Sequence, residues 1–194
     1  MSRADSLPET NFLNRFIQKL RYHEQSRQWF AVIFVLLVSW LGDTEQNLLI
    51  AGAVVASFGE IIRLWASGHV KKNKQLATDG PYAYVRHPLY VGNILIVIGF
   101  SIACNLWWSY VLMVALLLFY YPPTISYEDN KLKKIFGDEW VQWSQNIHAL
   151  IPTFGKKSGS ISSEWSFKQS LMGNLEPVIA AYLIGCLYLL YTTI

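Results

Sequence analysis

Five nearly uninterrupted apolar stretches constrain what this chain of 194 residues can fold into. Two are close to the roughly 20 residues that a helix needs to cross a bilayer core, and three are shorter. Charged residues make up only 15% of the chain, too few for the surface of a water-soluble protein of this size. We therefore predict an all-α polytopic membrane protein, a single domain over residues 1–194 with five transmembrane helices. The stretches span residues 29–42, 48–66, 89–103, 106–121 and 175–194.

The basic residues indicate how these helices would cross the membrane. Of the 16 Lys and Arg residues, five precede residue 29, four lie between residues 67 and 88, and six lie between residues 127 and 174. The last one, Arg63, lies inside the second stretch, and the connections on the opposite side contain none. Because basic loops stay in the cytosol, we expect a multi-pass protein with a cytosolic N-terminus, an outside C-terminus and two long cytosolic segments.

Several segments are expected outside the membrane core. Residues 12–20 place apolar and basic side chains on opposite faces of a helix, as an interfacial helix does. Pro122 and Pro123 remove two amide donors, so the fourth apolar helix should kink or end there. Short cytosolic helices are then predicted over residues 128–136 and 138–148, followed by a linker rich in Gly, Ser and Lys. The linker covers residues 155–163.

Several function classes find no support in the sequence. A Gly-rich dinucleotide motif after a strand is absent, and the four histidines lack the helical spacing of zinc proteases. Cys104 and Cys186 both lie in apolar stretches, which argues against a disulfide scaffold. We therefore expect no Rossmann domain, no metal centre and no nucleic-acid partner, and we expect membrane lipids around the protein.

Residues 75–92 contain the chemistry that stands out most. This segment crowds three tyrosines, Arg86 and His87 around Pro88, which is a favourable first residue of a helix. A helix N-terminus at the membrane face is a favourable place for a carboxylate. From spacing alone, an ordinary helix start and an anion or cofactor site are equally supported.

Acidic residues at two other places have both a structural and a functional interpretation. Glu60 and Arg63 are three residues apart on one helix, where an ion pair is the default interpretation. Glu128 and Asp129 follow the two prolines, where acids in a first helical turn usually serve as caps. However, the third and fourth apolar helices must form a hairpin, so Glu128 should emerge at the same level as His87.

Four motifs together resemble one known family. Their order and spacing within residues 69–152 resemble the isoprenylcysteine carboxyl methyltransferases, which are integral membrane enzymes, and the short N-terminal region resembles the compact prokaryotic branch. The resemblance implies methyl transfer from S-adenosylmethionine to a lipidic or prenylated acceptor at the cytosolic face of a cell membrane, with S-adenosylhomocysteine as product. The motifs are Arg-His-Pro-Leu-Tyr-Val-Gly at 86–92, Glu128-Asp129-x-x-Leu132, Phe136-Gly137-x-x-Trp140 and Ile151-Pro152.

The same resemblance implies a set of cofactor-binding residues. His87 and the helix start would hold the cofactor carboxylate, and Glu128 its ammonium or a ribose hydroxyl. We expect these two residues to position rather than to transfer protons, because an acceptor carboxylate is already ionised. Thr124 stands where eukaryotic members have an arginine associated with the lipid substrate. The implied set is Lys74, Gln75, Leu76, Ala77, Tyr82, His87, Pro88, Leu89, Tyr90 and Glu128.

Other functions remain open at the level of sequence. A phospholipid headgroup N-methyltransferase shares the style of motif and the acidic pair. An NADPH-dependent sterol-type reductase also ends in a stretch like Phe136-Gly137-x-x-Trp140, but it needs more basic residues for the 2′-phosphate. A membrane scaffold without enzymatic activity is the third alternative.

Overall fold

The computed structural model describes residues 24–70, 75–154, 165–166, 168–173 and 175–194, and all regular elements within these residues are helical. Each of the five apolar stretches forms one of the long helices, so the predicted all-α class is confirmed. The elements are α2 (Glu24–Leu41), α3 (Gln46–His69), η1 (Gly80–Ala83), α4 (Pro88–Ala103), α5 (Trp107–Phe136), α6 (Asp138–Ser144), η2 (Gln169–Gly173) and α7 (Glu176–Tyr191).

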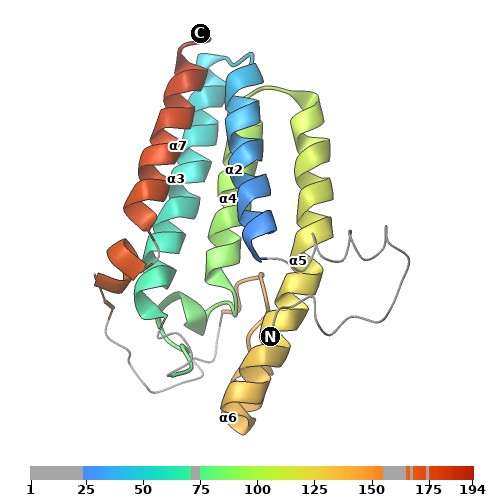
Figure 1. The fold of residues 1–194 in the computed structure, drawn as a ribbon, viewed down its shortest axis with the longest axis vertical. Coiled ribbons are helices and arrows are strands. Elements are labelled where there is room, and N and C mark those ends of the chain that lie inside the picture. Colours follow the sequence, from blue (N-terminus) through green and yellow to red (C-terminus); the bar gives the residue numbers. More distant parts are fainter. Residues whose placement is uncertain (1–23, 71–74, 155–164, 167, 174) are drawn as a thin grey trace.

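The long helices run alongside one another, and the C-terminus lies at the end opposite α6 (Figure 1). α3 packs along α4, α7 lies against α2 and α3, and α5 contacts α4. Of the described helices, α3 and α5 are long and apolar enough to cross a membrane, whereas the apolar parts of α2, α4 and α7 are shorter. Five membrane crossings therefore stay a prediction.

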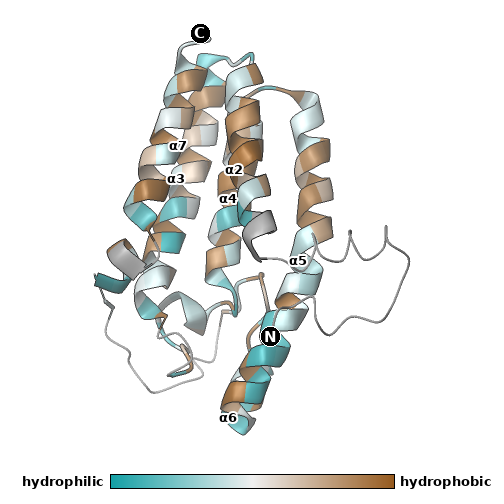
Figure 2. Ribbon diagram, in the orientation of Figure 1, coloured by the Kyte–Doolittle hydropathy of each residue, from teal (hydrophilic) through white to brown (hydrophobic). Residues whose placement is uncertain are grey.

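Apolar side chains cover much of the outer surface of this bundle. Figure 2 shows that hydrophobic residues dominate the long helices and that hydrophilic residues gather toward the α6 end. Val54 and Phe58 on α3, Leu118 on α5 and Ile184 on α7 are all more than half exposed. Such a surface suits a hydrocarbon environment, where apolar side chains need no cover.

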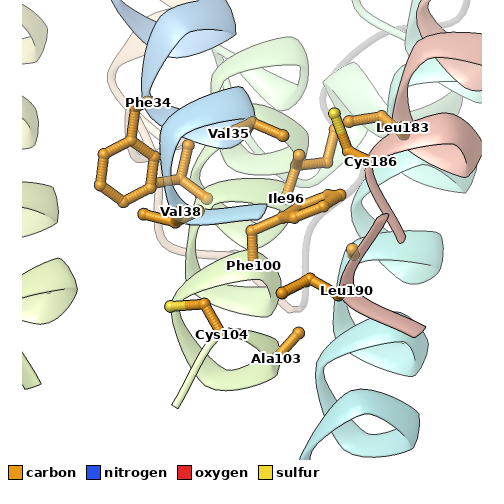
Figure 3. Packing of buried hydrophobic residues seen from close by; sticks show 12 residues of the cluster. Phe34, Val35, Val38, Ile96, Phe100, Ala103, Cys104, Leu183, Cys186 and Leu190 are labelled. Atoms are coloured by element: carbon orange, nitrogen blue, oxygen red, sulfur yellow. The ribbon is translucent and has the colours of Figure 1, made fainter. Parts of the chain in front are cut away.

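The core of the bundle lies where α2, α4 and α7 meet. Phe34 and Val38 from α2 pack with Phe100 from α4 and with Cys186 and Leu190 from α7 (Figure 3). All five are at most 2% exposed. Within a lipid environment such packing holds helices together through close van der Waals contact rather than through exclusion of water.

Glycines let α3 and α4 approach each other closely. A Cβ atom built on Gly59 would lie 2.6 Å from the carbonyl oxygen of Gly92, and one built on Gly99 would lie 2.6 Å from that of Gly52. No side chain fits at such distances, so the seam requires residues without a Cβ. Small residues at a helix interface are typical of membrane bundles.

α5 differs from its prediction because it continues through both prolines to Phe136. The prediction that the helix ends at the prolines was wrong, and so was the prediction of a separate helix starting at residue 128. The alternative prediction of a kink is confirmed, because the two halves of α5 differ in direction (Figure 1). The Thr124 hydroxyl donates a hydrogen bond of 2.7 Å to the carbonyl oxygen of Tyr120, a contact that bends helices. The capping interpretation of Glu128 and Asp129 is therefore wrong as well, because both lie inside a helix.

The predicted helix over residues 138–148 is also shorter in the structure. α6 ends at Ser144, and the chain then turns back toward the start of α4. The predicted interfacial helix at residues 12–20, the linker at residues 155–163 and Lys74 lie outside the described residues.

Candidate functional site

The segment before α4 is held in place by the chain that follows α6. The amide of Arg86 donates a hydrogen bond of 2.9 Å to the carbonyl of His148, and the amide of His87 donates one of 3.1 Å to the carbonyl of Ala149. A third bond of 2.8 Å joins the amide of Thr153 to the carbonyl of Tyr84. These backbone contacts fix the direction in which the side chains of Arg86 and His87 leave the loop.

His87 meets both acids of α5, and we call Arg86, His87, Glu128 and Asp129 the His87 cluster. The Nε2 atom of His87 lies 2.9 Å from Oδ1 of Asp129, and the Nδ1 atom of His87 lies 3.8 Å from Oε2 of Glu128. Arg86 forms an ion pair of 3.2 Å with Asp129. The continuous α5 thus brings Glu128 to the level of His87, as the hairpin argument predicts. Asp129 and Arg86 are members that the sequence-based set of cofactor residues missed.

Aromatic rings line the site on the bundle side. Tyr90 stacks on His87 with ring centroids 5.3 Å apart, and its ring meets the edge of Tyr121 at 5.4 Å. Tyr82 is buried, and its burial raises the pKa of the phenol well above the usual range. The nearby charge of Glu128 raises this pKa further, as the smaller of the two causes. Tyr82 therefore offers a neutral phenol at any physiological pH.

Three other predicted residues, Leu76, Ala77 and Leu89, pack around Tyr82. Leu76 and Tyr82 pack with Ala66 of α3 and with Trp140, Trp143 and Ile147, and Ala77 and Leu89 border this group. We call it the α6-side cluster. Pro88 is fully buried at the start of α4, and Gln75 is half-buried beside the cluster's loop. The described part of the predicted set therefore lies at one end of the bundle, around the start of α4.

The loop that carries these residues is tied to the end of α3. Gly80 has a φ of +55°, and a Cβ there would lie 2.6 Å from Nε2 of His69. His69 also contacts Asp79, with Nδ1 3.4 Å from Oδ2. Only glycine combines this left-handed backbone with such a close ring, which explains why the Asp-Gly-Pro sequence forms the turn.

A second polar cluster lies within the bundle, and we call Glu60, Arg63, Asn93 and Glu176 the Arg63 cluster. The predicted ion pair between Arg63 and Glu60 is present, with 3.4 Å between Nε and Oε2. Arg63 also donates to both carboxylate oxygens of Glu176 at 3.0 Å and to Asn93. Glu176 is 113 residues away in the sequence, so no local pattern could have revealed this partner.

An apolar cavity of about 580 Å³ lies between α2, α4, α5 and α7. Arg63 and Asn93 contribute to its wall, as does Tyr121, whose ring also touches Tyr90. The cavity therefore reaches from the Arg63 cluster to the aromatic side of the His87 cluster. Thr124 is buried and is not among its lining residues. Among the described residues, no group of three or more His, Cys, Asp or Glu side chains could hold a metal ion.

Comparison with known proteins assigns the chain to a family. The model of the phospholipid methyltransferase family matches residues 27–139, which is more than half of the chain and includes the entire His87 cluster. The chain belongs to this family. This methyltransferase is also 28% identical over 141 residues to a protein from Oryza sativa subsp. indica named "Probable protein-S-isoprenylcysteine O-methyltransferase", covering 72% of the chain and 71% of that protein. The predicted resemblance to isoprenylcysteine methyltransferases is thereby confirmed.

Two other relatives show how wide the group is. The cobalt-zinc-cadmium resistance protein CzcN of Cupriavidus metallidurans is 30% identical over 165 residues, covering 79% of this methyltransferase and 74% of the relative. A methanethiol S-methyltransferase of Crocosphaera subtropica is 35% identical over 87 residues, covering 42% and 31%. No solved structure matches. The methyltransferase relatives and the two long apolar helices support a membrane enzyme and speak against the reductase and scaffold alternatives.

Proposed function

We propose that this enzyme transfers the methyl group of S-adenosylmethionine to a lipidic acceptor at the cytosolic face of a cell membrane, most like the carboxyl methylation of isoprenylcysteine. One observation carries the proposal: the polar His87 cluster lies next to an apolar cavity, with the rings of Tyr90 and Tyr121 between them. A water-soluble cofactor and a lipid can meet only where such surfaces adjoin.

The His87 cluster suits the charges of the proposed cofactor. Glu128 and Asp129 bring two negative charges, and Arg86 brings one positive charge, so a surplus of negative charge faces the ammonium and sulfonium groups. Glu128 has the most exposed side chain of the three, at 29%, and is our proposed ligand of the ammonium or a ribose hydroxyl. The cofactor carboxylate is proposed to lie at the start of α4, where the helix dipole favours an anion.

The chain's contribution to the reaction is alignment and exclusion of water. S-Adenosylmethionine, when bound, supplies an electrophilic methyl group on its sulfonium. His87 is held between two carboxylates and stacked on Tyr90, so its position is fixed before a ligand arrives. Tyr90 and Tyr121 shield the reacting atoms from water, which strengthens the attraction between an acceptor carboxylate and the sulfonium. No proton transfer is needed for an acceptor that is already ionised.

The apolar cavity is our proposed site for the lipid part of the acceptor. Its wall is built from α2, α4, α5 and α7, and two of its lining residues, Tyr120 and Tyr121, directly precede the prolines inside α5. An acceptor would then enter sideways from the bilayer beside α5 rather than through water. The distribution of basic residues supports a cytosolic position of the His87 cluster, with five crossings and the C-terminus outside.

One observation favours a second acceptor class, the amine of a phospholipid headgroup. The Arg63 cluster combines two carboxylates with one arginine beside the cavity, and both oxygens of Glu60 lack a hydrogen-bond partner among the described residues. Two buried carboxyl groups around one arginine suit a cationic headgroup better than a second carboxylate. The family model that matches is also that of phospholipid methyltransferases.

A single labelling experiment separates these functions. The protein in lipid nanodiscs would receive S-adenosylmethionine labelled in the methyl group and either a short prenylated cysteine or phosphatidylethanolamine. A methyl ester releases labelled methanol in alkali, whereas an N-methyl group does not. We expect label in the prenylated cysteine, released by alkali. Stable label in phosphatidylethanolamine would favour the amine, and label in neither lipid would overturn the proposed lipidic acceptor.

A further inference from the structure

α6 carries two buried tryptophans whose indole N–H groups have no hydrogen-bond partner among the described residues. Trp140 is 9% exposed and Trp143 is 4% exposed, and within the described part of the chain neither Nε1 atom makes a hydrogen bond. An indole N–H is a donor only, and a buried donor without an acceptor destabilises a folded protein. Two such groups three residues apart on one short helix therefore call for an acceptor that the described residues do not provide.

The surroundings of these indoles point to one type of ligand. Both rings belong to the α6-side cluster with Leu76 and Tyr82, which is apolar and rich in aromatic rings. The guanidinium carbon of Arg86 lies 5.9 Å from the centre of the Trp140 ring, and the Nε atom of Arg86 is a third buried donor that has no acceptor among the described residues. The place thus combines flat apolar rings with hydrogen-bond donors that lack an acceptor among the described residues.

We propose that the indole N–H groups of Trp140 and Trp143 donate hydrogen bonds to ring nitrogens of an adenine bound against the α6-side cluster. A purine is flat, stacks on aromatic and apolar surfaces, and presents three ring nitrogens that only accept hydrogen bonds. The charged His87 cluster is left for the charged part of the cofactor. This inference rests on the proposed use of an adenosyl cofactor and adds α6 to its binding site.

Two conservative substitutions test the contacts directly. Trp140→Phe and Trp143→Phe each keep an aromatic ring but remove the N–H, and Trp108→Phe at the far end of α5 is the matched control. We expect calorimetry on the full chain in nanodiscs to show S-adenosylhomocysteine affinity about three- to tenfold lower for each α6 variant and unchanged for the control. Unchanged affinity in both α6 variants would overturn the inference.

Analogues of the ligand test the same contacts on the wild-type protein, so the result does not depend on how a variant folds. Three deaza analogues of S-adenosylhomocysteine each replace one purine ring nitrogen by CH. We expect at least one of them to lose affinity by a similar factor, and the corresponding tryptophan variant to be insensitive to that replacement. Equal binding of all three analogues would overturn the inference alone, whereas absence of any S-adenosylhomocysteine binding would overturn the proposed cofactor as well.

Discussion

Two clusters in this molecule have similar charges but different surroundings. The Arg63 cluster and the His87 cluster each combine one arginine with two carboxylates, which come from α3 and α7 in the first cluster and from α5 alone in the second. The charged side chains of the first are 1–12% exposed, whereas Glu128 in the second is 29% exposed. A buried ion pair that loses one partner leaves an uncompensated charge, but an accessible one can exchange a partner for water or a ligand. We therefore expect substitutions in the first cluster to affect folding and substitutions in the second to affect binding.

The largest expected effect is the loss of Glu176. Its carboxylate accepts two hydrogen bonds from Arg63 and joins α7 to α3, so Glu176→Ala should destabilise the protein by about 3–5 kcal/mol. Thermal unfolding in detergent would measure the change. Glu45→Ala, at an exposed position before α3, is the matched control and should shift the transition little. Equal shifts for both variants would mean that the Arg63 cluster does not hold the bundle together.

A smaller loss of stability is expected at the seam between α3 and α4. Gly59→Ala adds a Cβ that would lie 2.6 Å from the carbonyl oxygen of Gly92, so the two helices must separate, at a cost of about 1–3 kcal/mol. Gly185→Ala on α7 is the control, because a Cβ there meets nothing within 4 Å. It should leave the unfolding transition unchanged or raise it slightly, since alanine favours a helix. A seam variant as stable as the control would rule out the close approach.

A substitution that fills the cavity should lower methyl-transfer activity rather than the stability of the fold. Leu117 lines the cavity, whereas its neighbour Leu118 is 66% exposed on the outer surface of α5. Leu117→Trp should fill space meant for the acceptor and lower methyl transfer about tenfold, with cofactor affinity unchanged. Leu118→Trp should lower neither methyl transfer nor cofactor affinity. Loss of cofactor affinity in step with activity in Leu117→Trp would show that the cavity and the cofactor site are not separate.

Thr124 is the substrate residue that the resemblance suggests, but we expect its substitution to change the stability of α5 rather than acceptor binding. Its hydroxyl bonds to the backbone of α5, and its side chain does not line the cavity. Thr124→Val removes this hydrogen bond while keeping the shape, so we expect a loss of stability near 1 kcal/mol and little change in acceptor KM. A rise in KM for the acceptor without a change in stability would return Thr124 to the substrate site.

The sequence predicted the helices well because long apolar runs leave few alternatives. The helix formed from the stretch at 89–103 begins one residue before it, at Pro88, and ends with it. The continuity of α5 was missed, since local rules for Pro122 and Pro123 take no account of the packing that keeps a helix intact beyond a kink. That continuity is what brings Asp129 to His87.

The candidate site was predictable only where its members are close in sequence. His87 and Pro88 stand out because a polar pair adjoins a helix start, and Glu128 follows from the hairpin. Glu176 could not be predicted, because its contact with Arg63 depends on how α7 docks, 113 residues farther along the chain. Trp140 and Trp143 have the helical spacing of one face, but that spacing alone indicates packing and gives no sign of their unpartnered donors.

The central claim is that the His87 cluster holds the cofactor, and calorimetric titration of S-adenosylhomocysteine tests it most directly. The wild-type protein, His87→Ala and Glu128→Ala would be compared in the same nanodiscs, with thermal unfolding to verify that each is folded. We expect each variant to bind more weakly by about 1–3 kcal/mol while its unfolding temperature changes little, because both residues can contact the charged part of the ligand. Unchanged affinity in both folded variants would contradict the account.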